Sequence, residues 1–74
     1  MSERQRAIYQ VIDQLKPEYR DVVVLRLVEG MDSAETAAIL DWKTDKVQVT
    51  LSRAKKKLRQ LLIDQQIVEV RDDA

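Results

Sequence analysis

Pro17 and Gly30 divide the first half of this chain into two segments whose apolar residues repeat at helical spacing. Before Pro17, the apolar positions follow the i, i+3, i+4, i+7 pattern of one helical face and predict a helix over residues 3–15. A second helix is expected over residues 17–30, because proline is well tolerated as the first helical residue and glycine often ends a helix. The first half is therefore predicted to be helical throughout.

The second half carries the signals of a short helix, a turn and a long helix. Asp32 and Glu35 have the spacing of a capping box and predict a helix that starts at Asp32 and runs to Leu40. A turn is expected at residues 41–43, after which Thr44 or Asp45 can cap a helix over residues 44–63. The sequence predicts an all-α fold, a small four-helix domain over residues 1–63 with a helix-turn-helix in its second half.

Residues 64–74 form a C-terminal tail whose sequence is less decisive. Its apolar residues Ile67, Val68 and Val70 fit a continued helix, a strand or a frayed end. With 74 residues, the chain has room for one small core, and no linker or repeat divides it. The sequence therefore does not distinguish among these three structures for residues 64–74.

Composition excludes most catalytic and metal-binding functions. The chain contains no Cys and no His, which removes thiolate and imidazole metal ligands, disulfides and the commonest general base. We expect no enzyme activity, no cofactor and no small-molecule substrate. No apolar run reaches the roughly 20 residues that cross a bilayer, and the first residues lack the apolar core of a signal peptide. A cytoplasmic protein without a membrane partner is expected.

Charge is balanced overall but uneven along the chain. The 13 basic and 13 acidic residues cancel. Residues 43–59, however, hold seven basic side chains against Asp45 alone, so this stretch carries six positive charges and the rest of the chain six negative charges. Such asymmetry is typical of a protein that presents one face to a nucleic acid backbone. A helix face that is merely solvated would show the same pattern.

The long last helix has an apolar side and a polar side. Val47, Leu51, Ala54 and Leu58 share one face, which is predicted to be the core side. In a helix-turn-helix, the opposite side of the second helix enters the DNA major groove. There Arg and Lys donate to guanine, Gln pairs with adenine, and apolar groups touch the thymine methyl.

The residues expected to contact DNA lie on this outer side and on its flanks. Residues in the first turns of the helix are expected to contact base edges or groups beside them. The later basic residues, which also include Arg59, are expected to contact phosphates. The predicted DNA-binding residues are Lys43, Lys46, Gln48, Val49, Thr50, Ser52, Arg53, Lys55, Lys56 and Lys57. Trp42, in the turn, is expected to pack over Leu40 and the last helix, and Tyr9 and Tyr19 are expected at the core edge.

A larger pattern spans residues 15–62, with landmarks at Pro17, Arg20, Leu25 and Arg26, Glu29 and Gly30, Glu35 and Ala37, Ile39 and Leu40, Val47, Leu51, Arg53 and Ala54, and Lys57 and Leu58. This pattern resembles region 4 of bacterial sigma factors, especially the extracytoplasmic-function group. Both helix-turn-helix helices and both turns match, so the resemblance does not rest on one short motif. This sequence departs from the family at Asp41, where Gly is common, at Lys43, where a Ser cap is common, and at Gln48 and Val49.

The resemblance implies that the last helix reads the minus-35 element of double-stranded promoter DNA during transcription initiation. It also implies contacts with the RNA polymerase core and, in many members, with an anti-sigma factor. No counterpart of the sigma region that opens the promoter is present, so we expect a fragment of a longer sigma factor or a small stand-alone relative. Two alternatives remain: a protein-interaction module on polymerase or an anti-sigma factor with weak or no DNA binding, and a response-regulator output domain.

Overall fold

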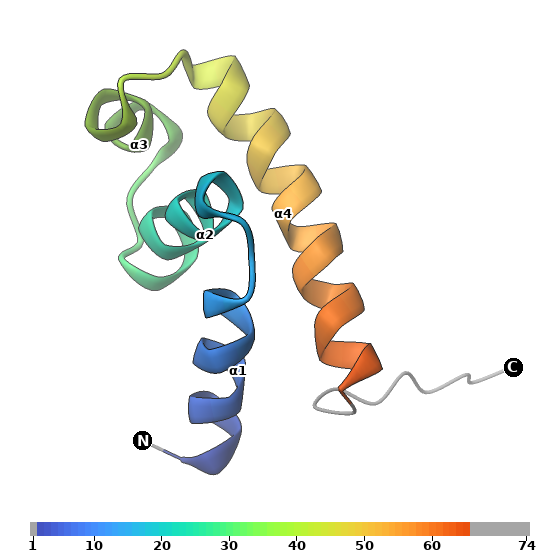
Figure 1. Ribbon diagram of the computed structural model, residues 1–74. Helices are drawn as coiled ribbons and strands as arrows, with labels where there is room; N and C mark the ends of the chain where they lie inside the picture. The colour runs from blue at the N-terminus through green and yellow to red at the C-terminus, as the bar shows by residue number, and fades with distance from the viewer. Residues whose placement is uncertain (1, 66–74) are drawn as a thin grey trace, which may run out of the picture.

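The computed structural model describes residues 2–65, and every element in that part of the chain is helical. Four α-helices follow one another, with a π-helical segment, η1, directly continuing the second (Figure 1). This arrangement confirms the predicted all-α fold. The elements are α1 Glu3–Asp13, α2 Pro17–Val23, η1 Val24–Val28, α3 Ser33–Leu40 and α4 Thr44–Asp64. The predicted possibilities for Ile67, Val68 and Val70 lie outside the described residues.

Helix α1 begins with a capping box that was not predicted from the sequence. The Gln5 amide donates to Ser2 Oγ at 3.2 Å, and the Ser2 amide donates to Gln5 Oε1 at 3.0 Å, so two otherwise unpaired donors are satisfied. The helix ends at Asp13, two residues before the predicted end. It stops early because Lys16 has the extended conformation that a following proline imposes, with φ −61° and ψ 154°.

The helix predicted over residues 17–30 is helical but not uniformly α-helical. It changes to π geometry after Val23, and the Glu29 amide bonds to the Val24 carbonyl at 2.8 Å, five residues back. Gly30 then adopts φ 75°, which allows the Met31 amide to close the helix on the Leu25 carbonyl at 3.0 Å. The predicted role of Gly30 in ending this helix is therefore confirmed.

The predicted turn at residues 41–43 is confirmed. Asp41 ends α3 in the left-handed conformation, with φ 57°, and the Trp42 amide bonds to the Ala37 carbonyl at 2.9 Å. Few residues other than glycine take this conformation cheaply, and aspartate is one that does so with some frequency. Asp41 therefore makes the turn without glycine, the residue that the resemblance led us to expect there.

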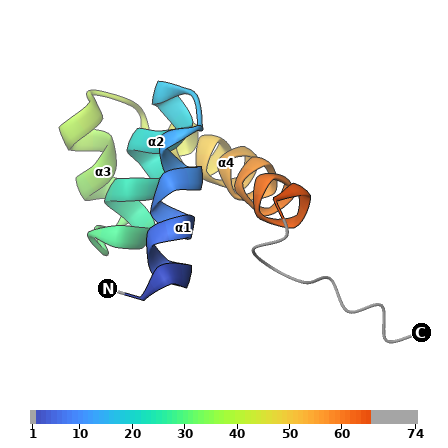
Figure 2. The same cartoon turned by 60° about the horizontal axis from the view of Figure 1, so that its bottom comes forward.

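Two buried clusters hold the helices together, one at each half of α4. Near its start, Val47 and Leu51 pack with Val22 of α2 and Ala37 of α3. Farther along α4, a cluster around Ala54 joins α1 to α2; its buried members are Ile12, Leu15, Val23 and Ala54. Figures 1 and 2 show the result: α1, α2 and α3 gather on one side of α4. Among residues 2–65, no helix covers the opposite side of α4.

Asp32 caps α3 and is expected to make the domain sensitive to acid. Its carboxylate accepts a hydrogen bond from the Glu35 amide at 2.8 Å, and this bond, helped by attraction to Arg26, holds the Asp32 pKa below its ordinary value of 3.8. A lowered folded-state pKa contributes stability above pH 3.8 that is lost as the pH falls through the folded value. Stability should therefore drop below about pH 4.

Asp32→Asn isolates this contribution, because asparagine caps a helix nearly as well but does not titrate. Urea unfolding followed by circular dichroism at several pH values should show a smaller acid loss in the variant than in the parent chain. Parallel loss of stability in both proteins below pH 4 would show that the cap does not contribute to acid unfolding.

Candidate nucleic-acid interface

The short helix α3, the turn and the start of α4 hold the interface in place. Trp42 packs with Leu40 against the cluster around Val22 and Val47, which confirms the predicted packing role of this tryptophan. The Lys46 ammonium lies 4.2 Å from the centre of the Trp42 ring, a cation–π contact. The turn is thus anchored in the core, and the first turns of α4 have a fixed direction.

The outer side of α4 carries the predicted DNA-binding residues. Nine of the ten are exposed, and Val49, an apolar residue, is 49% exposed in the middle of this surface. The exposed nine are Lys43, Lys46, Gln48, Val49, Ser52, Arg53, Lys55, Lys56 and Lys57. We call this set the α4 outer face.

Thr50 does not belong to the outer face, and its predicted exposure on the flank of the helix is wrong. Thr50 is only 7% exposed, and it shares the buried side of α4 with Val47, Leu51 and Ala54. The three-residue step from Val47 and the four-residue step to Ala54 bring Thr50 next to both of them on the helix surface. A base contact from Thr50 is therefore not supported by its position.

The predicted cap of α4 is also corrected. Thr44 and Asp45 are already inside the first turn, and the N-cap residue is Lys43, whose side chain makes no capping hydrogen bond. Lysine has no acceptor atom with which to satisfy the first amides of a helix. Asp45 still complements the positive end of the helix through its charge.

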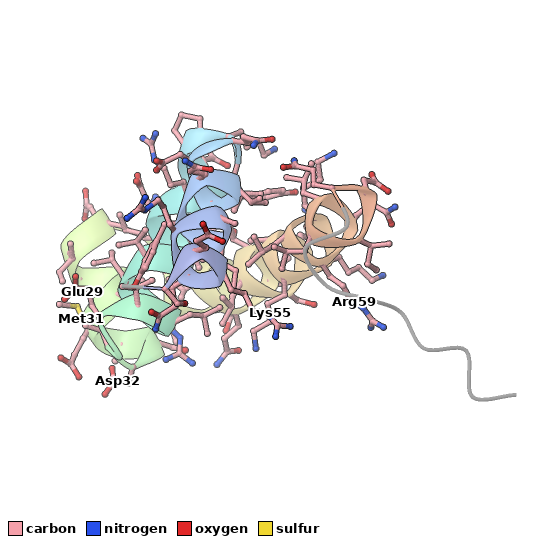
Figure 3. The ribbon with its side chains drawn as sticks, turned by 90° about the horizontal axis from the view of Figure 1, so that it is seen from below. Glu29, Met31, Asp32, Lys55 and Arg59 are labelled. Carbon is pink, nitrogen blue, oxygen red and sulfur yellow. The ribbon has the colours of Figure 1, made fainter. Side chains whose placement is uncertain are left out.

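The basic side chains of α4 are available to an anionic partner. Within residues 2–65, none of them forms an ion pair with a carboxylate; the ion pair found there joins Arg20 and Asp21 at 3.9 Å. Figure 3 shows Lys55 and Arg59 on one side of α4, apart from Glu29 and Asp32 in the loop before α3. Positive charge is thus concentrated on α4.

A cleft of about 350 Å³ separates the start of α2 from the first turns of α4. The Lys16 ammonium stands 4.4 Å from the centre of the Tyr19 ring in this cleft, and Arg53 of the outer face also lines it. Lys16 is not among the predicted site residues, because it precedes Pro17 and is nearly thirty positions from α4 in the chain. The lining residues are Lys16, Glu18, Tyr19, Asp45, Lys46, Val49, Thr50 and Arg53.

An apolar groove of about 300 Å³ lies between α1, η1 and α4. Tyr9, Leu27 and Val28 are 41%, 48% and 41% exposed there, which is a large exposure for such side chains. Tyr19 is partly buried against the core, as expected for a core-edge residue, whereas Tyr9 opens onto the groove. The lining residues are Gln5, Ile8, Tyr9, Ile12, Val23, Leu27, Val28 and Leu58.

Across residues 2–65, no helix combines the length and the apolar character needed to cross a membrane. The same part of the chain holds no group of three or more acidic, His or Cys side chains placed to bind a metal ion.

Comparison with known proteins gives a consistent result. The profile of the family described as "Sigma-70, region 4" matches residues 2–58. The chain is similar to "ECF RNA polymerase sigma factor SigX" of Bacillus subtilis (strain 168), with 39% identity over 57 residues, which are 77% of this chain and 29% of that protein. The chain therefore spans less than a third of the length of the relative that it matches. No solved structure is significantly similar to it.

Proposed function

The chain belongs to the Sigma-70 region 4 family, and from this premise we propose that it recognises the minus-35 element of double-stranded promoter DNA through α4. It acts in the cytoplasm and uses no enzymatic chemistry. The functional unit comprises residues 1–63, the range expected from the sequence, and α4 continues to Asp64. Family membership favours this reading over a response-regulator output domain.

The observation that carries the proposal is the outer face of α4. The 21-residue helix α4 has one side that is not packed against any other element of residues 2–65. That side combines cations that form no ion pair within those residues with Gln48 and Val49, which suit base edges. An α-helix with its side chains is about 10–12 Å across, which matches a major groove about 12 Å wide. The first half of α4 therefore has the size and chemistry for base readout.

Roles divide along the helix. Lys46, Gln48, Val49 and Arg53, in the first turns, contact base edges or groups beside them, with Lys43 and Ser52 at the margin of this contact. The later residues Lys55, Lys56 and Lys57 bind phosphates, which adds affinity and salt dependence but no sequence information. Thr50 is excluded from these roles by its burial.

An NMR titration tests the proposal. Isotope-labelled protein is titrated with a short duplex carrying a minus-35 element of the extracytoplasmic-function type, and with a duplex of the same base composition in scrambled order. We expect shifts confined to residues 43–57, larger for the promoter duplex and smaller at high salt, since phosphate contacts release counterions. If neither duplex moves any resonance at low salt, α4 is not a DNA-reading helix.

The apolar groove supports a second role, docking on the RNA polymerase core. Within α4, the groove includes Leu58 but none of the outer-face residues, so a protein and DNA could occupy the domain together. Exposed apolar patches on small domains commonly mark protein contacts. Unlabelled polymerase core should broaden the resonances of Tyr9, Leu27 and Val28 before those of the outer face. An anti-sigma factor that competes for this groove would displace the polymerase.

A further inference from the structure

We propose that the cleft between α2 and α4 binds one phosphate of the DNA backbone and that Lys16 is its principal ligand. The inference rests on the proposed function, because it requires α4 to enter the major groove. It adds a contact from outside the helix-turn-helix, at a residue that carries no landmark of the sigma region 4 pattern. The ligand is a phosphodiester group of duplex DNA.

Position is the first argument. Val49 and Arg53 belong both to the outer face and to the cleft wall, so the cleft opens at the edge of the surface that meets DNA. A helix that fills the major groove brings the two sugar-phosphate backbones along its flanks. Hence the DNA strand that lies beside the first half of α4 passes over the cleft and reaches Lys16, just before α2.

The second argument is the state of the Lys16 side chain. Its ammonium is held 4.4 Å from the centre of the Tyr19 ring, and Tyr19 is itself packed against the core. A flexible lysine side chain loses rotamer entropy when it binds a phosphate. The cation–π contact with Tyr19 already restrains this side chain before DNA binds, so less entropy is lost. Lys16 also forms no ion pair with a carboxylate of residues 2–65. The N–H donors that do not face the Tyr19 ring can therefore bind a phosphate.

Charge in the cleft is the third argument. Lys16, Lys46 and Arg53 line the cleft against the carboxylates of Glu18 and Asp45, which leaves one net positive charge. Lys46 and Lys16 are each held over an aromatic ring, Lys46 at 4.2 Å from the centre of Trp42 and Lys16 at 4.4 Å from the centre of Tyr19, so both cations are restrained beside the cleft. The two carboxylates oppose a phosphate, and removing one of them should therefore strengthen binding.

Fluorescence anisotropy with the promoter and scrambled duplexes, between about 50 and 200 mM salt, tests the phosphate site. Lys16→Ala should bind both duplexes about five- to tenfold more weakly, with the ratio of the two affinities unchanged. The slope of the logarithm of the binding constant against the logarithm of the salt concentration should become shallower by about 0.9. Glu18→Gln should bind both about two- to fivefold more tightly. Arg6→Ala, an exposed cation on α1 outside the cleft, serves as the matched control and should change little.

A methylphosphonate scan then identifies the contact itself. Neutralising the phosphate that Lys16 binds should weaken the parent protein but have no further effect on Lys16→Ala. Lys16 is exposed and makes no capping bond, so circular dichroism of the variant should match that of the parent. If the parent binds DNA and Lys16→Ala has the same affinity and salt slope, the phosphate site is wrong and the proposed function stands. If the parent binds neither duplex, both are wrong.

Discussion

Leu51→Ala should lower the free energy of unfolding by about 2 to 5 kcal/mol, the cost of truncating a buried leucine. Leu51 is 8% exposed and joins α4 to Val22 of α2 and Ala37 of α3. The removed methyl groups leave a cavity at the place where three helices meet. Because a domain of this size is stabilised by only about 4 to 11 kcal/mol, the loss is a large part of the total.

Urea unfolding followed by the fluorescence of Trp42, the single tryptophan, measures this effect beside the altered cluster. Val49→Ala is the matched control, since it truncates an aliphatic residue of the same helix that is 49% exposed. Its free energy of unfolding should change by less than about 0.5 kcal/mol, as at most surface sites. Equal destabilisation by the two changes would overturn the assignment of the buried and outer sides of α4.

Arg53→Ala should weaken binding to the promoter duplex by about 5- to 150-fold, which corresponds to about 1 to 3 kcal/mol. Arg53 is exposed, lies on the outer face and lines the cleft, and forms no ion pair within residues 2–65. Its guanidinium is therefore free to donate two parallel hydrogen bonds to a guanine or a phosphate. Its loss removes a DNA contact without opening the core.

Anisotropy titrations against promoter and scrambled duplexes separate the two kinds of contact. A larger loss on the promoter duplex indicates that Arg53 reads a base, whereas equal losses indicate a phosphate. Arg4→Ala, on the exposed first turn of α1, removes the same charge far from the cleft and controls for the change in net charge. Unchanged DNA affinity in a folded Arg53→Ala protein would remove Arg53 from the interface.

Much of the fold follows from features that act over a few residues. Pro17 and Gly30 interrupt the helices for steric reasons that no distant contact alters. The Asp32 cap and the turn at residues 41–43 likewise depend on neighbours in the chain. Even so, the capping box at Ser2 and the π geometry of η1 were not predicted, although both are local.

The outer face of α4 was largely predictable because helical periodicity determines which residues share a side. Thr50 marks the limit of that argument. At 100° per residue it lies about 60° from Val47, on the border between the two sides, so its burial depends on whether another helix covers that border. The structure buries it, and the sequence alone contained no measure of how far neighbouring helices extend.

Sequence alone determined the helices, their breaks and the basic side of α4, because spacing, capping and steric restriction operate within one or two turns. Tertiary structure decided the burial of Thr50, the cleft that brings Lys16 beside Arg53, and the apolar groove between α1 and η1. These three features depend on how α1, α2 and η1 pack against α4. Such packing joins residues distant in the chain, which no local pattern encodes.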